Sequence, residues 1–534
     1  MSSSDLFDPS ASTPPRESVP ASGAAAHEGA RGARGERTEP IPYRIPMAAG
    51  GSLSAYRYPS TAGRAAAVVL FTPYRKESWW LVTHVQPTLD GYEVFVVDVG
   101  GFGDSSGTSA GPLSPTEIDN AVEALAWIAA QPFCDGRTAL IGSSYSGAIQ
   151  WHIAARQPPS LRCIAPSIAF LDRYRELAHR GGIPSSPVWA ASTYANSANS
   201  TTARAGLAQA VEDFLDPFDG PRWRVESAAE VLDRVKTPAL CIGGLYDIFT
   251  ASTVSAFQSL SVPSRLVLGP WGHETEVSDV ERAELSRWLA YWLCDEGDDP
   301  TARGTRVRVY RSGDDEWQDL GEWPSVEELI WATWTPLTSA IRLPVNALLD
   351  ATPPPTSMSH TDPAIDVGLD SGMRTWSEQW TVRTSFGSEP TVLLGSVMLD
   401  AWFISPSGAE IDVHCRLSLV RANGEVEQLA ESRLRSSHRL VDRSRSIVRS
   451  DGELVVPWRP HQTLAPVKPG DRFELEIAFP PIHLAVGPGD AVQLGLTIVE
   501  PASNEAPDGV ELLPSTRVLL PRIPPRGTIP EFSS

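Results

Sequence analysis

A serine-rich turn at residues 141–147, Ile-Gly-Ser-Ser-Tyr-Ser-Gly, has the residue types that nucleophilic catalysis uses. It follows a strand-like run and precedes a helix-like one, and such a sharp turn tolerates only small residues two positions either side of its centre. Ser144 has Gly142 and Ser146 at those positions, whereas Ser143 has an isoleucine there. The steric pattern therefore selects Ser144 as a candidate nucleophile, although small-residue turns without chemistry are also common.

Activation of a serine hydroxyl needs a base to take its proton and a carboxylate to orient that base. In α/β folds with such a turn, the acid and then the histidine follow the serine along the chain. Asp247 follows the apolar run at 238–243, and His273 follows the next one at 264–268. Both are expected at the carboxyl ends of parallel strands, where ligands bind in open sheets. The order predicts that Ser144, His273 and Asp247 act as nucleophile, base and orienting acid.

Each of these residues alone has a simpler structural explanation. An aspartate after a strand is often a cap, and a single histidine is often structural. The chain has ten histidines, of which only His273 has the expected order and placement. His152 is the nearest competitor, but it lies about two turns along the following helix and is expected to point elsewhere. A glycine-rich stretch at 98–107 has some likeness to a dinucleotide-binding loop, but its third glycine is one position too late.

The tetrahedral intermediate of acyl transfer needs hydrogen-bond donors directed at its oxyanion. The backbone N–H of Tyr145, which directly follows the serine, is one candidate donor. A second donor is expected from the loop after an early strand, and Pro73-Tyr74 occupies that place. The Tyr74 phenol could serve as that donor, although a tyrosine at a strand end is usually a packing residue.

Strand and helix signals alternate over the first 300 residues. Several apolar runs are continuous, which indicates strands buried on both faces, as in a parallel sheet. Ser114-Pro115-Thr116-Glu117 is a capping box, and apolar residues at helical spacing follow it. The pattern predicts a doubly wound α/β domain. The expected strands are 65–71, 93–99, 138–142, 161–168 and 238–243.

The remaining segments suggest three further parts of the chain. Residues 1–38 are poor in large apolar residues and are expected to be a disordered tail before an α/β domain at 39–300. The strand pattern lapses at 170–235, which predicts a helical cap inserted after the serine turn. Short strands with Gly, Pro and Ser between them predict an all-β sandwich or jelly roll at 305–534.

Composition limits the classes of partner. The formal net charge is −21, and no run of Lys and Arg supplies the basic patch that a nucleic-acid or anionic-membrane partner needs. The five cysteines form no C-x-x-C pair, so neither a zinc site nor a disulfide framework is expected. No apolar run approaches the ~20 residues that span a bilayer. We expect a cytoplasmic protein, and the sequence carries no signal for its oligomeric state.

The ordered motifs resemble the cocaine esterase-like family, which includes X-Pro dipeptidyl-peptidases and α-amino acid ester hydrolases. The resemblance extends from about residue 40 to the end and implies an α/β-hydrolase core, a helical cap and a C-terminal jelly roll. It also implies that the Tyr74 hydroxyl and the Tyr145 amide form the oxyanion hole, and that Phe249 lines the acyl pocket. The matching motifs are Gly142 to Gly147, Thr72-Pro73-Tyr74, Tyr246-Asp247, Gly269 to His273, Val307 to Tyr310, Glu316-Trp317 and Trp323-Pro324.

Two departures from the family pattern bear on function. The family's D-x-R-G after the third strand is Asp98-Val99-Gly100-Gly101 here, without the arginine. The stretch Ile248-Phe249-Thr250 has no acid to hold a substrate ammonium, so an apolar or aromatic acyl ester, or an amide, is the expected small-molecule substrate. The reaction needs no metal or cofactor. Acyl transfer, an X-Pro-type dipeptidyl aminopeptidase and a degenerate binding protein remain alternatives.

Overall fold

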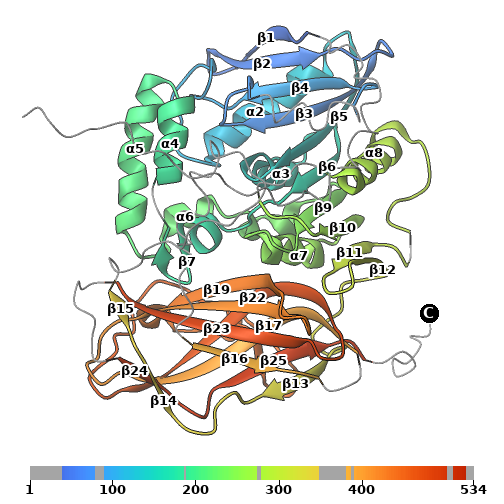
Figure 1. Cartoon of the computed structure of the whole chain (residues 1–534). Coiled ribbons are helices and arrows are strands. Elements are labelled where there is room, and N and C mark those ends of the chain that lie inside the picture. The colour runs from blue at the N-terminus through green and yellow to red at the C-terminus, as the bar shows by residue number, and fades with distance from the viewer. Residues whose placement is uncertain are drawn as a thin grey trace, which may run out of the picture. The chain divides into compact units, whose positions relative to one another are not determined.

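The computed structural model describes residues 39–78, 89–185, 188–273, 278–302, 304–347, 380–386, 390–501 and 509–524. The predicted tail at 1–38 lies outside these residues. Two regions of different architecture follow one another along the described chain, an α/β region and then a β-rich region (Figure 1). Each region is built around its own buried apolar cores.

A ten-stranded sheet forms the centre of the α/β region. Its order is β1-β2-β4-β3-β5-β6-β9-β10-β11-β12, with parallel pairing from β4 to β11. The pairs β1–β2, β2–β4 and β11–β12 are antiparallel. The strands are β1 (Ile41–Pro46), β2 (Ser52–Tyr58), β3 (Ala65–Thr72), β4 (Glu93–Asp98), β5 (Cys134–Ser143), β6 (Leu161–Ser167), β9 (Ala239–Gly244), β10 (Ser264–Gly269), β11 (Val307–Arg311) and β12 (Glu316–Leu320).

The five strands listed above correspond to β3, β4, β5, β6 and β9, and the strand expected at 264–268, before His273, corresponds to β10. The sheet also includes strand β11, which the sequence assigned to the β domain at 305–534. Val307 pairs with Leu266 and Val309 with Leu268, so β11 extends the parallel sheet beside β10. The residue at which one domain ends and the next begins stays a prediction.

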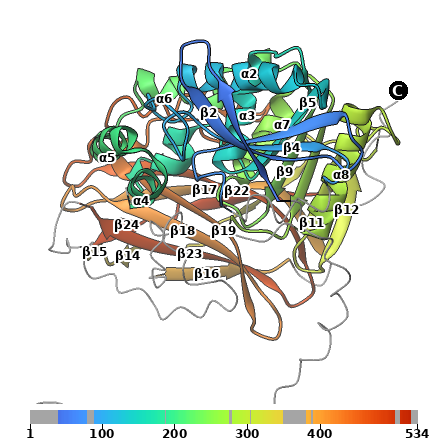
Figure 2. The ribbon, with the colours of Figure 1, turned by 90° about the horizontal axis from the view of Figure 1, so that it is seen from above.

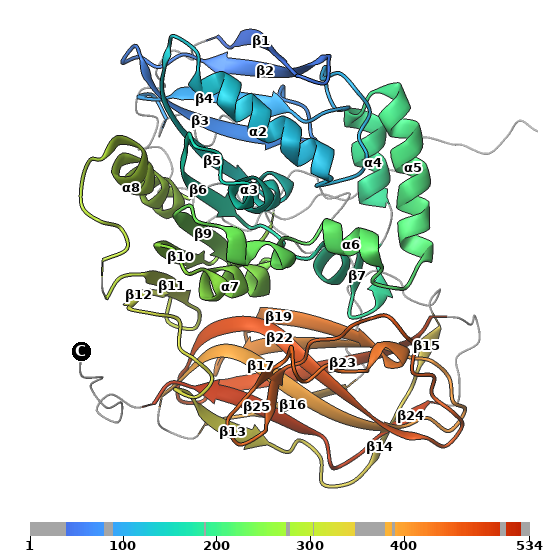
Figure 3. The ribbon, with the colours of Figure 1, turned by 180° about the vertical axis from the view of Figure 1, so that it is seen from behind.

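Helices cover both faces of this sheet, as expected for a doubly wound fold. On one face, α2 (Pro115–Ala129), α3 (Tyr145–Ala155) and α7 (Thr250–Ser259) contribute Ile118, Ile149 and Phe257 to the largest apolar core (Figure 3). On the other face, α8 (Asp279–Cys294) contributes Leu285, Trp288 and Leu289 to a second core. The alternate residues of each strand fill these two cores, which explains the continuous apolar runs in the sequence.

The segment between β6 and β9 is mainly helical. It coincides with the predicted insertion at 170–235, and its longest helices, α4 and α5, pack side by side (Figure 2). Its elements are a π-helix η2 (Tyr174–Ala178), the short strands β7 (His179–Arg180) and β8 (Ile183–Pro184), α4 (Val188–Ser197), α5 (Ser200–Leu215), α6 (Pro221–Val225), and the 3₁₀ turns η3 (Ala228–Glu230) and η4 (Leu232–Arg234). We call this segment the insertion.

The β-rich region consists mainly of two sheets that share one apolar core, with residues such as Phe403 from one sheet and Leu417 from the other. The shared core makes this region a β-sandwich, whereas the jelly-roll topology stays a prediction. One sheet holds β13 (Ile330–Trp334), β14 (Ile341–Leu343), β17 (Thr391–Ile404), β22 (Arg472–Val486), β24 (Val510–Leu512) and β25 (Arg517–Arg522). The other holds β15 (Asn346–Ala347), β16 (Trp380–Thr384), β18 (Asp412–Val420), β19 (Val426–Arg435) and β23 (Ala491–Glu500).

Two short strands, β20 (Ile447–Val448) and β21 (Leu454–Val456), form a separate ladder, and η5 (Ser436–His438) is a single 3₁₀ turn. Within the described residues, no helix combines the length and the apolar character that crossing a bilayer requires.

Candidate active site

Ser144 lies at the tight turn between β5 and α3. Its backbone has φ 55° and ψ −121°, a conformation that is strained for a residue with a side chain. Gly142 permits the turn, because a Cβ there would lie 2.6 Å from the Cβ of Ser146. The Ser144 amide donates to the Ser167 carbonyl of the neighbouring strand β6 at 3.0 Å. These contacts are the physical basis of the small-residue pattern in the sequence.

The structure brings together the three side chains that the sequence predicts as a triad. His273 Nε2 lies 3.1 Å from Ser144 Oγ, and His273 Nδ1 lies 2.7 Å from Asp247 Oδ2. Asp247 is buried, and its second oxygen, Oδ1, accepts the Phe249 amide at 2.6 Å. The imidazole therefore has one nitrogen on the carboxylate and the other within reach of the serine hydroxyl.

The loops after β9 and β10 hold the acid and the histidine beside each other. Tyr246 N donates to the Trp271 carbonyl at 3.1 Å, and Leu245 N donates to the Gly269 carbonyl at 2.8 Å. Because β9 and β10 are adjacent and parallel, their carboxyl ends meet at the same edge of the sheet. The strand order alone therefore brings Asp247 and His273 together.

Tyr246, which precedes the acid, also contacts the second half of the chain. Its hydroxyl lies 2.7 Å from Ser312 Oγ and donates to Glu427 Oε1 on β19 at 2.8 Å. Arg421 neutralises Glu427 through a 3.0 Å ion pair. A residue of the β-sandwich thereby holds the loop that carries Asp247.

The two predicted oxyanion donors lie on either side of Ser144. Tyr145 is the first residue of α3, so its backbone N–H has no acceptor within the helix. The Tyr74 hydroxyl is buried, and burial raises its pKa, an effect that the Ser144 side chain partly offsets. The rings of Tyr74 and Tyr145 meet edge to face with centroids 6.3 Å apart. Both donors therefore belong to the surroundings of the serine.

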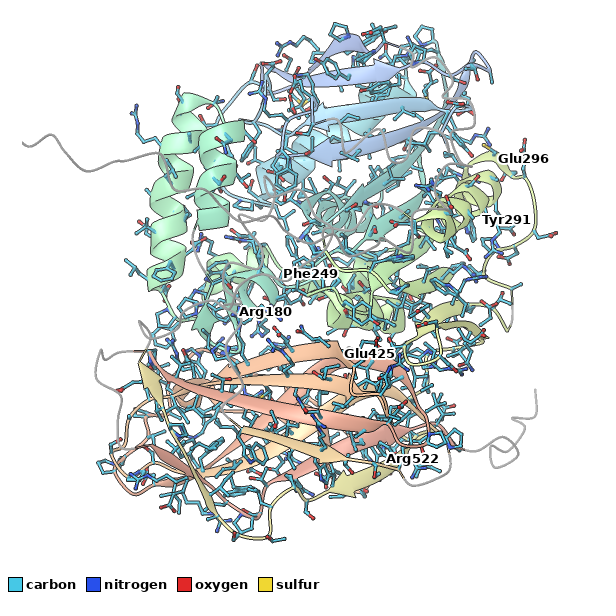
Figure 4. All side chains as sticks on the ribbon, viewed as in Figure 1. Arg180, Phe249, Tyr291, Glu296, Glu425 and Arg522 are labelled. Carbon is cyan, nitrogen blue, oxygen red and sulfur yellow. The ribbon has the colours of Figure 1, made fainter. Side chains whose placement is uncertain are left out.

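Phe249 and His152 lie in different surroundings. Phe249, which is labelled in Figure 4, is 1% exposed. It packs edge to face against the His273 ring, with centroids 5.1 Å apart. Phe170 contacts its other side at 5.5 Å. His152 hydrogen-bonds to the backbone of Glu226, and burial lowers its pKa to about 4. As expected, His152 points away from Ser144.

Asp98, whose motif lacks the family's arginine, has a lysine as its cation. Lys76 Nζ lies 3.1 Å from Asp98 Oδ2 and 2.8 Å from Asp104 Oδ2, and the Lys76 amide donates to Asp98 Oδ1 at 2.6 Å. Burial raises the pKa of Asp98, and Lys76 opposes that shift. Gly103 lets the glycine-rich loop wrap around the carboxylate, since a Cβ there would lie 2.1 Å from Asp98 Oδ2. The loop that begins with Tyr74 is thus tied to β4 by a buried ion pair, and Gly103 allows the close approach to Asp98.

Replacement of Lys76 tests this ion pair. Lys76→Met leaves the Asp98 carboxylate buried without its cation, which we expect to lower the free energy of unfolding by about 3 kcal/mol at pH 8. The double variant Lys76→Met/Asp98→Asn removes both charges and should recover part of that loss. Urea unfolding of both variants and the wild type measures the difference. Equal losses in the single and double variants would contradict the ion-pair explanation.

Glu117 has a neighbour that the sequence did not predict. The Ser114 hydroxyl caps α2 by accepting the Glu117 amide at 3.4 Å, but the Glu117 carboxylate is the acceptor of the Tyr145 hydroxyl at 2.5 Å. Leu113 N donates to the same hydroxyl at 3.0 Å. Burial raises the pKa of Glu117 to about 7. Half of the predicted capping box therefore forms, and its glutamate contacts the residue after the candidate nucleophile.

The raised pKa of Glu117 has a consequence for stability. The carboxyl ionises near 4.5 in the unfolded chain and near 7 in the fold, so stability is lost as pH rises through this interval. Glu117→Gln does not titrate, and above pH 7 it should exceed the wild type by up to about 3 kcal/mol in unfolding free energy. Urea unfolding at pH 5 and pH 8.5 measures the gap, which should be much larger at pH 8.5. A gap that is independent of pH would show that Glu117 has an ordinary pKa.

Two models of known protein families match this chain. The model of the X-Pro dipeptidyl-peptidase (S15) family matches residues 55–275, and that of the X-Pro dipeptidyl-peptidase C-terminal non-catalytic domain matches residues 302–498. The chain belongs to the cocaine esterase-like and X-Pro dipeptidyl-peptidase family. The family matches and the relatives indicate a serine hydrolase enzyme rather than a degenerate binding protein.

Individual relatives are distant. The cocaine esterase of Rhodococcus sp. (strain MB1 Bresler) is 26% identical over 351 residues, which cover 52% of this chain and 59% of the esterase. A CocE/NonD family hydrolase from Staphylococcus aureus superposes with a TM-score of 0.72 at 17% identity, covering 90% of this chain and 93% of that one. An α-amino acid ester hydrolase superposes with a TM-score of 0.68 at 16% identity, covering 94% and 100%. At these identities the structures show a common hydrolase fold.

In the part of the chain that the structure describes, no group of three or more His, Cys, Asp or Glu side chains is arranged to hold a metal ion.

Proposed function

We propose that this protein hydrolyses an acyl ester or amide of a small molecule through an acyl-enzyme formed on Ser144. The observation that carries the proposal is the continuous line of contacts from Asp247 through His273 to Ser144, at 2.7 and 3.1 Å. These are the separations at which a carboxylate orients an imidazole and the imidazole takes a hydroxyl proton. The family membership supports the same chemistry.

The proposed cycle has two halves. His273 Nε2 takes the proton of Ser144 Oγ while Oγ bonds to the substrate carbonyl carbon, and the carbonyl oxygen becomes an oxyanion. The imidazolium returns its proton to the leaving alcohol or amine, which departs and leaves an ester on Ser144. A water molecule, deprotonated by the same imidazole, attacks this ester and releases the acid. Asp247 stabilises the imidazolium in both halves.

The oxyanion is stabilised by the Tyr145 amide and the Tyr74 hydroxyl. The amide is supported as a donor by its place at the start of α3. The phenol is supported by its burial next to the Ser144 side chain, because burial raises its pKa and keeps it protonated as a donor. Neither group has to reorganise during the reaction, and removal of such a donor is costly for that reason.

The insertion is proposed to act as a cap over the substrate. Its α4–α5 junction is bound to the loop after β4, since Gly103 N donates to the Ser197 carbonyl at 2.7 Å and Asn199 N donates to the Gly101 carbonyl at 2.9 Å. The rings of Phe102 and Tyr194 also pack against each other, tilted by 33° with centroids 5.8 Å apart. The same loop is packed against the segment that carries Tyr74, so the insertion is anchored at the edge of the sheet where the site lies.

The acyl group is proposed to be uncharged and apolar or aromatic. Phe249 and Phe170 form an aromatic pair beside His273, and the stretch 248–250 carries no carboxylate for an ammonium group. We predict that uncharged acyl esters exceed the corresponding aminoacyl esters and X-Pro anilides in kcat/KM. Initial rates on a panel of matched substrates measure this order. Preference for X-Pro anilides would instead assign a dipeptidyl aminopeptidase.

Labelling and turnover test the assignment of the nucleophile. A fluorophosphonate probe should label the wild type and Ser143→Ala, its matched control, but not Ser144→Ala, which lacks the attacking oxygen. Tyr74→Phe loses one oxyanion donor and should lower kcat by about 10²- to 10³-fold. Gel fluorescence and ester hydrolysis measure both results. Labelling of folded Ser144→Ala would refute Ser144 as the nucleophile.

The same enzyme preparation can separate hydrolysis from acyl transfer. With a competing alcohol or amine present, we predict the free acid as the main product, because water resolves the acyl-enzyme in the proposed cycle. Chromatography of the products measures the ratio of acid to transfer product. A dominant transfer product at low concentrations of the competing nucleophile would assign an acyltransferase.

A further inference from the structure

Tyr145 is held at two points that lie at opposite ends of the residue. Its backbone begins α3 directly after Ser144, and its hydroxyl sits in a buried polar pair with Glu117. Tyr145 is 6% exposed and Glu117 is also 6% exposed, so water does not compete freely for this hydrogen bond. The Leu113 amide donates to the same oxygen from the other side. The phenol is therefore fixed by one donor and one acceptor.

The Glu117 carboxylate has no cation at hydrogen-bond distance among the ion pairs of the described residues. Glu226, whose charge acts on Glu117, is itself paired with Arg173 at 2.6 Å, and Arg173 also binds Asp213 at 2.9 Å. Arg173 is thus already paired with two other acids. The strongest contact that remains to Glu117 is the Tyr145 hydroxyl.

Burial of an acid without a neighbouring cation costs folding free energy, so the presence of Glu117 at this position needs an explanation. The capping of α2 does not provide one, because Ser114 alone accepts the helix amide and the Glu117 carboxylate is turned inward. The turn at Ser144 does provide one. A residue held at positive φ keeps its conformation only where its surroundings determine it, and Tyr145 is the next residue along the chain.

We propose that Glu117 is a positioning residue of the active site, which fixes the direction of the Tyr145 amide toward the oxyanion by binding the hydroxyl of the same residue. This proposal rests on the proposed function, because it assumes that the Tyr145 amide stabilises the oxyanion. The ring is rigid and has only two side-chain torsions, so an anchor at the hydroxyl limits rotation of the first turn of α3. Small errors in the direction of such a donor cost rate, not substrate affinity.

The protonation state of Glu117 should modulate this effect. A carboxylate accepts a hydrogen bond more strongly than a neutral carboxyl group does. Burial raises the pKa of Glu117 to about 7, so the anchor strengthens as pH rises through neutrality. The groups that face Glu117 are Tyr145 on α3, Tyr194 on α4 and Glu226 after α6, of which the two tyrosines stay neutral in this range because burial raises their pKa values.

Four variants test the proposal. Tyr145→Phe removes the donor and keeps the backbone amide, Glu117→Leu removes the acceptor, and Glu117→Gln keeps an acceptor oxygen that does not titrate. Asp119→Leu, an exposed acid two residues further along α2, is the matched control. Steady-state kcat and KM on an uncharged chromogenic acyl ester are measured between pH 5.5 and 9.5, and thermal melting by circular dichroism checks that each variant is folded.

We expect Tyr145→Phe and Glu117→Leu to lower kcat by about 10- to 100-fold with KM within about two-fold of the wild type. A double variant, Tyr145→Phe/Glu117→Leu, should be no slower than the slower of its two single variants, because both substitutions act on one contact. Glu117→Gln should recover most of kcat and lose the step near pH 7, and the Asp119→Leu control should behave as the wild type. If Glu117→Leu does not fold, Tyr145→Phe and Glu117→Gln still test the positioning function of Glu117.

Contrary results overturn different statements. Wild-type kcat in folded Tyr145→Phe, an effect on KM alone, or additive effects in the double variant would overturn the positioning function of Glu117 while leaving Ser144-dependent turnover intact. Absence of turnover in the wild type on every acyl substrate, together with absence of fluorophosphonate labelling, would overturn the proposed function and this inference together.

Discussion

The strained backbone of Ser144 is the constraint on which the rest of the site depends. A non-glycine residue at positive φ costs on the order of 1–3 kcal/mol and persists only where its neighbours enforce it. Here the enforcement comes from β5 before the turn, α3 after it, and the amide bond to Ser167 on the adjacent strand. The large cores on the two faces of the sheet hold these elements in place, so the stability of the whole α/β region is used to present one hydroxyl at a fixed position.

The order of the strands in the sheet places His273 and Asp247 near the Ser144 hydroxyl. Strands β5, β6, β9 and β10 are consecutive neighbours in a parallel sheet, so residues at their carboxyl ends converge although they are far apart in the chain. The two buried carboxylates at this edge have partners: Asp247 accepts the Phe249 amide and contacts the His273 ring, and Asp98 accepts the Lys76 amide and ammonium. Polar groups that are satisfied in this way keep a single arrangement, which a preorganised site requires.

The sequence predicted the parts of this arrangement that depend on local patterns. Continuous apolar runs located β3 to β6 and β9, and the small residues around Ser144 located the turn, because both are determined by burial or sterics within a few residues. The antiparallel strands β1 and β2 were missed, since half-exposed edge strands such as Ile41–Pro46 lack a continuous apolar run. The contacts of Lys76 with Asp98 and of Glu117 with Tyr145 join residues 22 and 28 positions apart. Local patterns carry no such information, and Glu117 matched a capping box well enough to hide its other contact.

The hydrogen bond from Tyr246 to Glu427 makes evolutionary change in one half of the chain depend on the other half. Asp247 directly follows Tyr246, whose hydroxyl is held by Glu427 of the β-sandwich. The sandwich therefore helps to position the acid of the site, although it contributes no reacting atom. A recombination event that exchanged the second half for that of a distant relative would have to supply an equivalent acceptor at the same point. The two halves are therefore constrained to diverge as a pair, and neither is a freely interchangeable module.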